Sequence, residues 1–141
     1  MQPLTVLEYN MFWGLKNLTS LDLTMNKISV IEIGAFKGLD SLRDLILYGN
    51  QISMVRSGTF ADLHNLESLH LFDNNITKIE PGAFTGLINT TFLDLEKNNL
   101  KKLERGMFRG LPKLDWLNLK GTPIEDIEEG TFFYFFMITT L

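Results

Sequence analysis

The chain of 141 residues has no cysteine, which excludes disulfide bonds, thiolate zinc sites and a cysteine nucleophile. Basic residues are outnumbered, since 13 Lys and Arg stand against 17 Asp and Glu, and the formal net charge is −4. Phosphate binding needs a basic surface, so this composition argues against nucleic acid as a partner. No apolar run approaches the ~18–20 residues that a membrane span requires. The opening residues, MQPLTVLEYNMFWGL, also lack the basic start and small-residue cleavage site of a signal peptide.

Hydrophobic residues are not scarce, and one of them dominates. They make up 45% of the chain, which excludes disorder by composition. The length fits about one ordinary domain. Leucine alone occupies 24 of the 141 positions, and so strong a bias toward one residue suggests an internal repeat.

The repeat has a period of 24 residues with no insertion or deletion. Leu-x-Leu pairs recur at Leu21/Leu23, Leu45/Leu47, Leu69/Leu71, Leu93/Leu95 and Leu117/Leu119. Phenylalanine recurs in the same register at Phe12, Phe36, Phe60, Phe84, Phe108 and Phe132. Glycine recurs at Gly34, Gly58, Gly82, Gly106 and Gly130. Within each unit, the alternation around the leucine pair predicts one short strand with its leucines on one face. Stacked units then form a parallel sheet, and each unit depends on its neighbours for stability.

The pattern L-x-x-L-x-x-L-x-L-x-x-N-x-I-x-x-I-x-x-G-x-F-x-x resembles the leucine-rich repeat family. The match is to its 24-residue animal type, whose GAF-x-GL ending stands here as GAFKGL and GAFTGL. The resemblance implies an α/β-type solenoid, a right-handed horseshoe with a parallel concave β-sheet. Its convex side is expected to be irregular or to hold short helices, with the phenylalanines stacked in a column.

The register divides residues 1–141 into a single array. We expect a partial repeat at 1–14, complete repeats at 15–38, 39–62, 63–86, 87–110 and 111–134, and a partial repeat at 135–141. Neither end carries a capping unit, although solenoids need polar-faced caps and this repeat type usually has cysteine-rich ones. The sequence therefore favours an internal piece of a longer ectodomain.

An asparagine follows most of the leucine pairs, at Asn26, Asn50, Asn74 and Asn98. Backbone groups are buried where the chain turns inward after each strand, and leaving one unpaired costs ~1–3 kcal/mol. Because the asparagine amide both donates and accepts, we interpret these four residues as a structural ladder. Thr122 replaces the fifth asparagine, and its hydroxyl can supply only part of the bonding. Thr90 replaces an expected leucine, which predicts a local packing defect.

The residues between the core leucines form the solvent-facing surface of the expected sheet, in three columns. The columns are Ser20, Asp44, Ser68, Phe92 and Trp116; Asp22, Ile46, His70, Asp94 and Asn118; and Thr24, Tyr48, Phe72, Glu96 and Lys120. Adjacent strands lie ~4.8 Å apart, so Tyr48 should neighbour Phe72 and Phe92 should neighbour Trp116.

Four aromatic residues on a face that is not core are typical of a protein-binding hot spot. Cross-strand aromatic pairs that only stabilise the sheet remain the alternative. The predicted ligand-binding residues are Asp22, Ile46, Tyr48, His70, Phe72, Phe92, Asp94 and Trp116. Acidic residues around them, Asp73 among them, would favour a protein ligand with a basic rim.

Few residues in the sequence indicate a catalytic or metal-binding site. The two histidines are His64, in a convex-side turn, and His70, alone on the strand face. A nearby Asp94 could tune His70, yet one such pair on a flat sheet lacks a water-excluding pocket. Two histidines and scattered acids have no metal-ligand spacing, and the glycines are turn residues rather than a phosphate loop. We expect no enzyme activity, no metal and no cofactor.

Three N-x-S/T sequons begin at Asn17, Asn75 and Asn89, all on expected solvent-facing positions. They are compatible with a secreted glycoprotein. Since the animal repeat type is extracellular, the resemblance implies an extracellular or cell-surface location, with no signal peptide in this chain.

The sequence therefore predicts protein recognition by the concave face, in a receptor or adhesion protein similar to Toll-type, Slit-type or insect adhesion ectodomains. A structural or matrix-organising protein and an intracellular repeat scaffold remain alternatives. The aromatic run from Phe132 to Met137 is too short for a membrane anchor. It fits contact with a partner or a further repeat, or a splice-junction artefact, and predicts aggregation if exposed.

Overall fold

The structure is a computed structural model that describes residues 2–133. Within this range the chain alternates between longer and shorter strands joined by turns. The three-residue strands are β2 (Ser20–Asp22), β4 (Asp44–Ile46), β6 (Ser68–His70), β8 (Phe92–Asp94) and β10 (Trp116–Asn118). The two-residue strands are β1 (Val6–Leu7), β3 (Val30–Ile31), β5 (Met54–Val55), β7 (Lys78–Ile79), β9 (Lys102–Leu103) and β11 (Asp126–Ile127).

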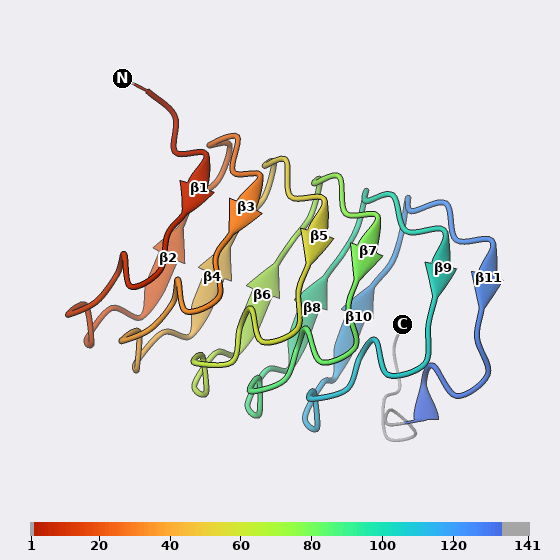
Figure 1. Ribbon diagram of the computed structural model, residues 1–141. Coiled ribbons are helices and arrows are strands. Elements are labelled where there is room, and N and C mark those ends of the chain that lie inside the picture. Colours follow the sequence, from red (N-terminus) through yellow and green to blue (C-terminus); the bar gives the residue numbers. More distant parts are fainter. Residues whose placement is uncertain (1, 134–141) are drawn as a thin grey trace.

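The three-residue strands form one parallel sheet in the order β2-β4-β6-β8-β10. Paired residues are 24 apart throughout, as in Leu45 opposite Leu69 and Leu69 opposite Leu93. The short strands pair in parallel as β1-β3, β5-β7 and β9-β11 on the opposite side of the coil. Figure 1 shows the two rows, with the main sheet behind and the short strands in front. The solenoid and its parallel sheet are therefore confirmed.

The convex side differs in one detail from the expectation. Turns and two-residue strands make up this side, and no α-helix occurs between residues 2 and 133. The irregular convex side is thus confirmed and the short helices are not seen. The reason is local: each complete convex segment has a glycine at positive φ two residues before its phenylalanine, and this conformation interrupts a right-handed helix.

The core runs the length of the coil. Leucines of the main strands point inward and are almost fully buried in the central repeats, as Leu45, Leu69 and Leu93 show. The phenylalanine column is continuous, with ring centroids 5.8–6.2 Å apart from Phe12 to Phe132. Each ring stacks nearly parallel on the next, so neighbouring repeats bury each other's apolar surface.

Hydrogen bonds show the ladder at Asn50, Asn74 and Asn98, whereas the Asn26 amide donates to the Thr24 carbonyl of its own repeat. Asn50 accepts from the Asn26 and Ile28 backbone N–H groups at 3.0 and 2.9 Å, and its amide donates to the carbonyls of Leu23 and Leu47. Asn74 and Asn98 repeat this arrangement one and two repeats later. Asn74 accepts from the Ile52 N–H and donates to the carbonyls of Leu47 and Leu71. Asn98 accepts from the Ile76 N–H and donates to the carbonyls of Leu71 and Leu95.

The two threonine departures behave differently. The Thr122 hydroxyl accepts from the Leu100 N–H at 2.8 Å and donates to the Leu100 carbonyl at 3.3 Å, so it satisfies one residue instead of bridging three. The expected partial replacement is therefore confirmed. Thr90 is fully buried, and its hydroxyl donates to the Leu66 carbonyl at 2.8 Å. The polar group is satisfied, and the packing defect stays a prediction.

One glycine is required by a close approach of two repeats. Gly86 has φ +99°, and a Cβ there would lie 2.5 Å from the Ala61 carbonyl oxygen. A side chain at this position would push apart the turns of adjacent repeats, because the contact is with backbone. The glycine therefore sets the spacing of the coil on its convex side.

Candidate functional site: the concave sheet surface

Backbone register places the candidate side chains. Phe92 and Trp116 are the first residues of β8 and β10, while Tyr48 and Phe72 lie two residues beyond the ends of β4 and β6. Because Cβ atoms alternate along a strand, these side chains face solvent while the intervening leucines enter the core. All four aromatic residues are partly exposed. We call this surface the concave face, made of the three outward columns listed above.

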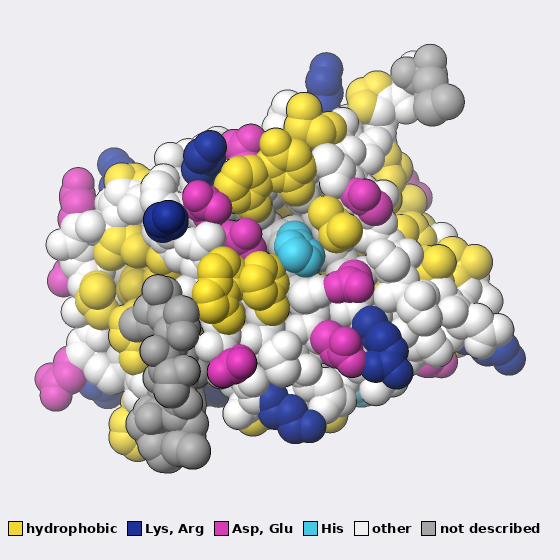
Figure 2. All heavy atoms as spheres, turned by 180° about the vertical axis from the view of Figure 1, so that it is seen from behind, with side chains coloured by type: hydrophobic (Ala, Val, Ile, Leu, Met, Phe, Trp, Pro, Cys, Tyr) yellow, Lys and Arg dark blue, Asp and Glu magenta, His cyan; other side chains and the backbone are white. Residues whose placement is uncertain are grey.

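The aromatic residues form two stacked pairs, as the register predicts. The Tyr48 and Phe72 rings have centroids 4.8 Å apart at 30°, and those of Phe92 and Trp116 are 4.4 Å apart at 10°. His70 lies between the pairs, and its ring is tilted on Phe92 at 5.0 Å. The predicted aromatic residues are therefore brought together on one surface. Figure 2 shows hydrophobic side chains on this face gathered around a histidine, with acidic side chains between and beside them.

Acidic residues on the concave face are held by short local contacts. Asp22 accepts from the Thr24 backbone N–H and hydroxyl. Asp44 accepts from the Ser68 hydroxyl of the next strand. Glu96 accepts from the Asn118 amide at 3.2 Å. In the part of the chain that the structure describes, none of these carboxylates takes part in an ion pair.

Two aspartates of the central column have opposite pKa shifts. Burial raises the pKa of Asp94; the charge of Glu96 adds to this effect, while a backbone N–H bond from Glu96 and the charge of His70 oppose it. The pKa of Asp22 is lowered, chiefly by the hydroxyl of Thr24 and then by its backbone N–H. Asp94 therefore lies in the drier part of the concave face, next to the aromatic pairs.

Sequence reasoning missed the partner of Phe72. The Lys97 ammonium lies 5.4 Å from the Phe72 ring centroid, so Phe72 has Tyr48 on one side and a cation near its ring. Lys97 follows the third column of β8 at φ +55°. Its adjacency to Phe72 could have been read from the register, but the direction of a long lysine side chain could not.

Beside the far end of the sheet lies a surface hollow of about 580 Å³. It is lined by Glu96, Trp116, Asn118, Leu119 and Lys120. The hollow therefore places a carboxylate, an indole ring and a lysine around one opening.

The two histidines lie on different sides of the described part of the chain, and no nucleophile and base are brought together around either of them there. His70 faces Asp94 in the adjacent strand, and His64 lies exposed in a convex-side turn. Among residues 2–133, no group of three or more His, Asp or Glu is arranged to hold a metal ion. None of the described residues belongs to a helix with the length and apolarity needed to cross a bilayer.

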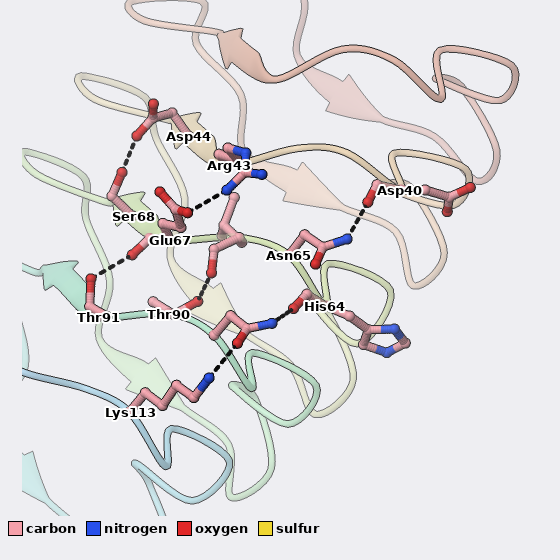
Figure 3. A network of polar contacts seen from close by, with 12 residues as sticks. Asp40, Arg43, Asp44, His64, Asn65, Glu67, Ser68, Thr90, Thr91 and Lys113 are labelled. Carbon is pink, nitrogen blue, oxygen red and sulfur yellow. Dashed lines mark hydrogen bonds and ion pairs between the residues drawn. The ribbon is translucent and has the colours of Figure 1, made fainter.

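The three sequons lie outside the concave columns and differ from one another. Asn17 and Asn75 are exposed, and Asn75 accepts a hydrogen bond from the Asn99 amide. Asn89 is half-buried; its amide donates to the His64 carbonyl at 2.8 Å, and its oxygen accepts from the Lys113 ammonium at 2.8 Å. Figure 3 shows this polar network along one flank of the coil, together with the Arg43–Glu67 ion pair.

A family model described as leucine rich repeat matches residues 16–76 and again residues 65–124. These matches cover most of the chain, so the protein belongs to the leucine-rich repeat family. No curated protein sequence matches the chain at a significant level.

Among solved structures, the chain is similar to Toll-like receptor 13 in the crystal structure of the TLR13–ssRNA13 complex. The identity is 34% and the TM-score 0.92, over 99% of this chain and 20% of that one. It is also similar in fold to Toll in two structures of the Drosophila Toll–Spatzle complex. These match at 23% and 24% identity with TM-scores of 0.86 and 0.85, over 94% and 93% of this chain and 18% and 17% of Toll.

The chain thus spans about a fifth of the length of these receptors. The likeness confirms the resemblance to Toll-type receptors. It leaves the exclusion of nucleic acid without support, because one of these receptors was solved with a single-stranded RNA.

Proposed function

We propose that the chain recognises a protein ligand with its concave face, as part of an extracellular or cell-surface receptor or adhesion protein. The observation that carries the proposal is the pair of stacked aromatic platforms, Tyr48–Phe72 and Phe92–Trp116. The repeat needs no apolar side chain on this face, since the core is filled by the leucines of the opposite face. Exposed aromatic clusters of this kind mark interaction sites.

The platforms are also pre-organised. Each ring is packed against its partner from the adjacent strand, so binding immobilises few additional rotamers. The parallel sheet beneath them is rigid, because every strand is fixed by register to its neighbours. We therefore expect docking with little change in backbone shape.

Two similar structures support ligand recognition by such arrays, since they are complexes of Toll with Spatzle and of TLR13 with single-stranded RNA. The TLR13 complex makes single-stranded nucleic acid the alternative ligand, because bases also stack on aromatic side chains. The acidic composition of the concave face favours protein over RNA, since phosphates would meet carboxylates there. We propose no catalytic role and no cofactor.

A displayed library of random twelve-residue peptides, selected on the folded 141-residue chain, tests the proposal. We expect enriched peptides to lose binding when Phe72→Ala and Trp116→Ala are combined, by about tenfold or more, since aromatic anchors carry most of a hot spot's affinity. The melting temperature should change little, because both side chains lie outside the core.

Tyr9→Ala combined with Trp13→Ala is the matched control. These two aromatic residues are 57% and 69% exposed and lie outside the concave columns. Selected peptides that lose binding in the control, or keep it in the concave variant, would contradict the proposal.

The extracellular location is tested by the sequons. Asn17 and Asn75 present exposed amides, whereas both ends of the Asn89 amide are bonded. In secretory expression we expect glycan mass on Asn17 or Asn75, measured on proteolytic peptides before and after glycosidase treatment. Complete absence of glycan from both would argue for the intracellular scaffold instead.

A further inference from the structure

The concave face carries a net negative charge, which favours a cationic ligand. Of its fifteen outward positions, four are carboxylates and one is a lysine. The carboxylates are Asp22, Asp44, Asp94 and Glu96, and in the described part of the chain they are held by neutral donors rather than by cations. Their negative charge is therefore not neutralised within the concave face.

The two aromatic platforms lie at diagonally opposite positions on this acidic surface. Tyr48–Phe72 lies in the third column between β4 and β6, while Phe92–Trp116 lies in the first column between β8 and β10. Four residues along a strand and two strand spacings across it separate the platforms by about 16 Å. The midpoint of this diagonal falls in the central column between β6 and β8.

The residues at that midpoint are His70 and Asp94, which are register partners. Glu96 follows Asp94 by two residues on the same outward face. A cationic group at the midpoint would meet the Asp94 carboxylate, which burial leaves poorly hydrated. It would also have aromatic rings on both sides, and the Lys97 ammonium near Phe72 shows that such a ring already accepts a cation in this surface.

We propose that the protein ligand docks through an arginine-bearing segment, with its guanidinium over Asp94 and Glu96 and an apolar or aromatic side chain on each platform. The inference rests on the proposed function and adds the chemistry of the partner. Guanidinium fits better than ammonium, because it is planar, stacks on rings and bonds carboxylates with several N–H groups. In an extended segment, residues one and five lie on the same side about 13 Å apart, with residue three between them, and large side chains at both ends cover the remaining distance to the platforms.

The probe is a five-residue peptide, acetylated and amidated, with tryptophan at positions one and five, arginine at position three and serine between them. A matched peptide carries citrulline in place of arginine, which keeps the shape and removes the charge. Binding of both to the ¹⁵N-labelled 141-residue chain is followed by amide chemical shifts at pH 7.5. We expect shifts in β6 and β8 and an affinity for the arginine peptide about fivefold or more above that for citrulline.

Asp94→Asn combined with Glu96→Gln should reduce the affinity for the arginine peptide to that of the citrulline peptide. Both replacements keep the acceptor oxygens that bond the Glu96 N–H and the Asn118 amide, so the surface keeps its shape. Phe72→Ala with Trp116→Ala should instead weaken both peptides by the same factor.

Equal affinities for arginine and citrulline at the concave face would overturn the inference and leave the proposed function standing. Shifts confined to other surfaces would overturn the inference as well. A thirteen-residue oligouridine that binds the concave face more tightly than the arginine peptide, with affinity falling steeply in salt, would replace the protein ligand with RNA and overturn both proposals.

Discussion

At the scale of single residues, equivalent positions in the repeat do not have equivalent chemistry. Asp22 and Asp94 occupy the same column three repeats apart, yet the pKa of one is lowered and that of the other raised. Asp22 is exposed and bonded by Thr24, whereas Asp94 lies partly buried beside Glu96 and the aromatic pairs. The repeat therefore determines the position of each carboxylate, whereas the pKa of that carboxylate depends on the residues around it.

This difference predicts opposite effects of pH on two matched variants. The folded pKa of Asp94 lies above its unfolded value, so ionisation of Asp94 disfavours folding once the pH exceeds that range. Asp94→Asn should therefore raise the melting temperature at pH 7 and bring no gain near pH 3. The folded pKa of Asp22 lies below its unfolded value, so its stabilisation is present above the unfolded pKa and lost as the pH falls. Asp22→Asn should lower the melting temperature at pH 7 only.

Thermal unfolding by circular dichroism from pH 3 to pH 8 checks both variants. Glu96 and His70 lie beside Asp94 and act on its pKa, so the comparison is made against the parent chain at each pH. A stabilising effect of Asp94→Asn that is the same at pH 3 and pH 7 would show that burial of the charge is not its cause.

At the scale of elements, Asn50, Asn74 and Asn98 each bond backbone groups of their own repeat and of the preceding one, so a single side chain serves two repeats. Asn74 accepts from the Ile52 N–H at 3.1 Å and donates to the Leu47 carbonyl at 2.9 Å. Both partners belong to the preceding repeat, and the asparagine itself is 8% exposed. The side chain therefore replaces strand pairing at the point where the sheet ends.

Asn74→Ala should destabilise the chain by about 1–3 kcal/mol, because it leaves the buried Ile52 N–H without a partner and removes one of the two amide donors to the Leu47 carbonyl. Asn26→Ala is the control; Asn26 is half-buried, and its amide donates only to the Thr24 carbonyl of its own repeat at 3.2 Å. We expect it to cost under about 1 kcal/mol. Urea unfolding followed by fluorescence measures both, and equal losses would contradict the bridging role of the ladder.

The 24-residue spacing predicts the positions of the strands and their neighbours but not the directions of individual side chains. The period of 24 without a gap placed every main strand and both aromatic pairs, because register alone decides which residues are neighbours. It did not predict the Lys97–Phe72 contact or the tilt of His70 on Phe92, since these depend on side-chain rotamers. The expectation of convex helices came from the family resemblance, and the glycine at positive φ in each complete convex segment interrupts them.

At the scale of the whole molecule, stability is a property of neighbouring repeats rather than of one central core. The described contacts between strands join each main strand only to those beside it. Burial follows the same rule: Leu39 and Leu63 are 1% and 0% exposed, whereas Leu15 at the same position of the first complete repeat is 48% exposed. The N-terminal turn of this chain therefore lacks the packing that the central turns receive from both sides.

A stack of this kind should open from its less packed end. In native-state hydrogen exchange at neutral pH, we expect amides of β2 to exchange at least about tenfold faster than those of β6, because opening one terminal repeat breaks a single interface. Leu21 of β2 is only partly buried, while Leu69 of β6 is completely buried between β4 and β8. Peptides that cover the two strands resolve the difference by mass spectrometry. Identical protection of β2 and β6 would mean that the coil opens only as one unit, and the concave face would then lose its platforms together rather than repeat by repeat.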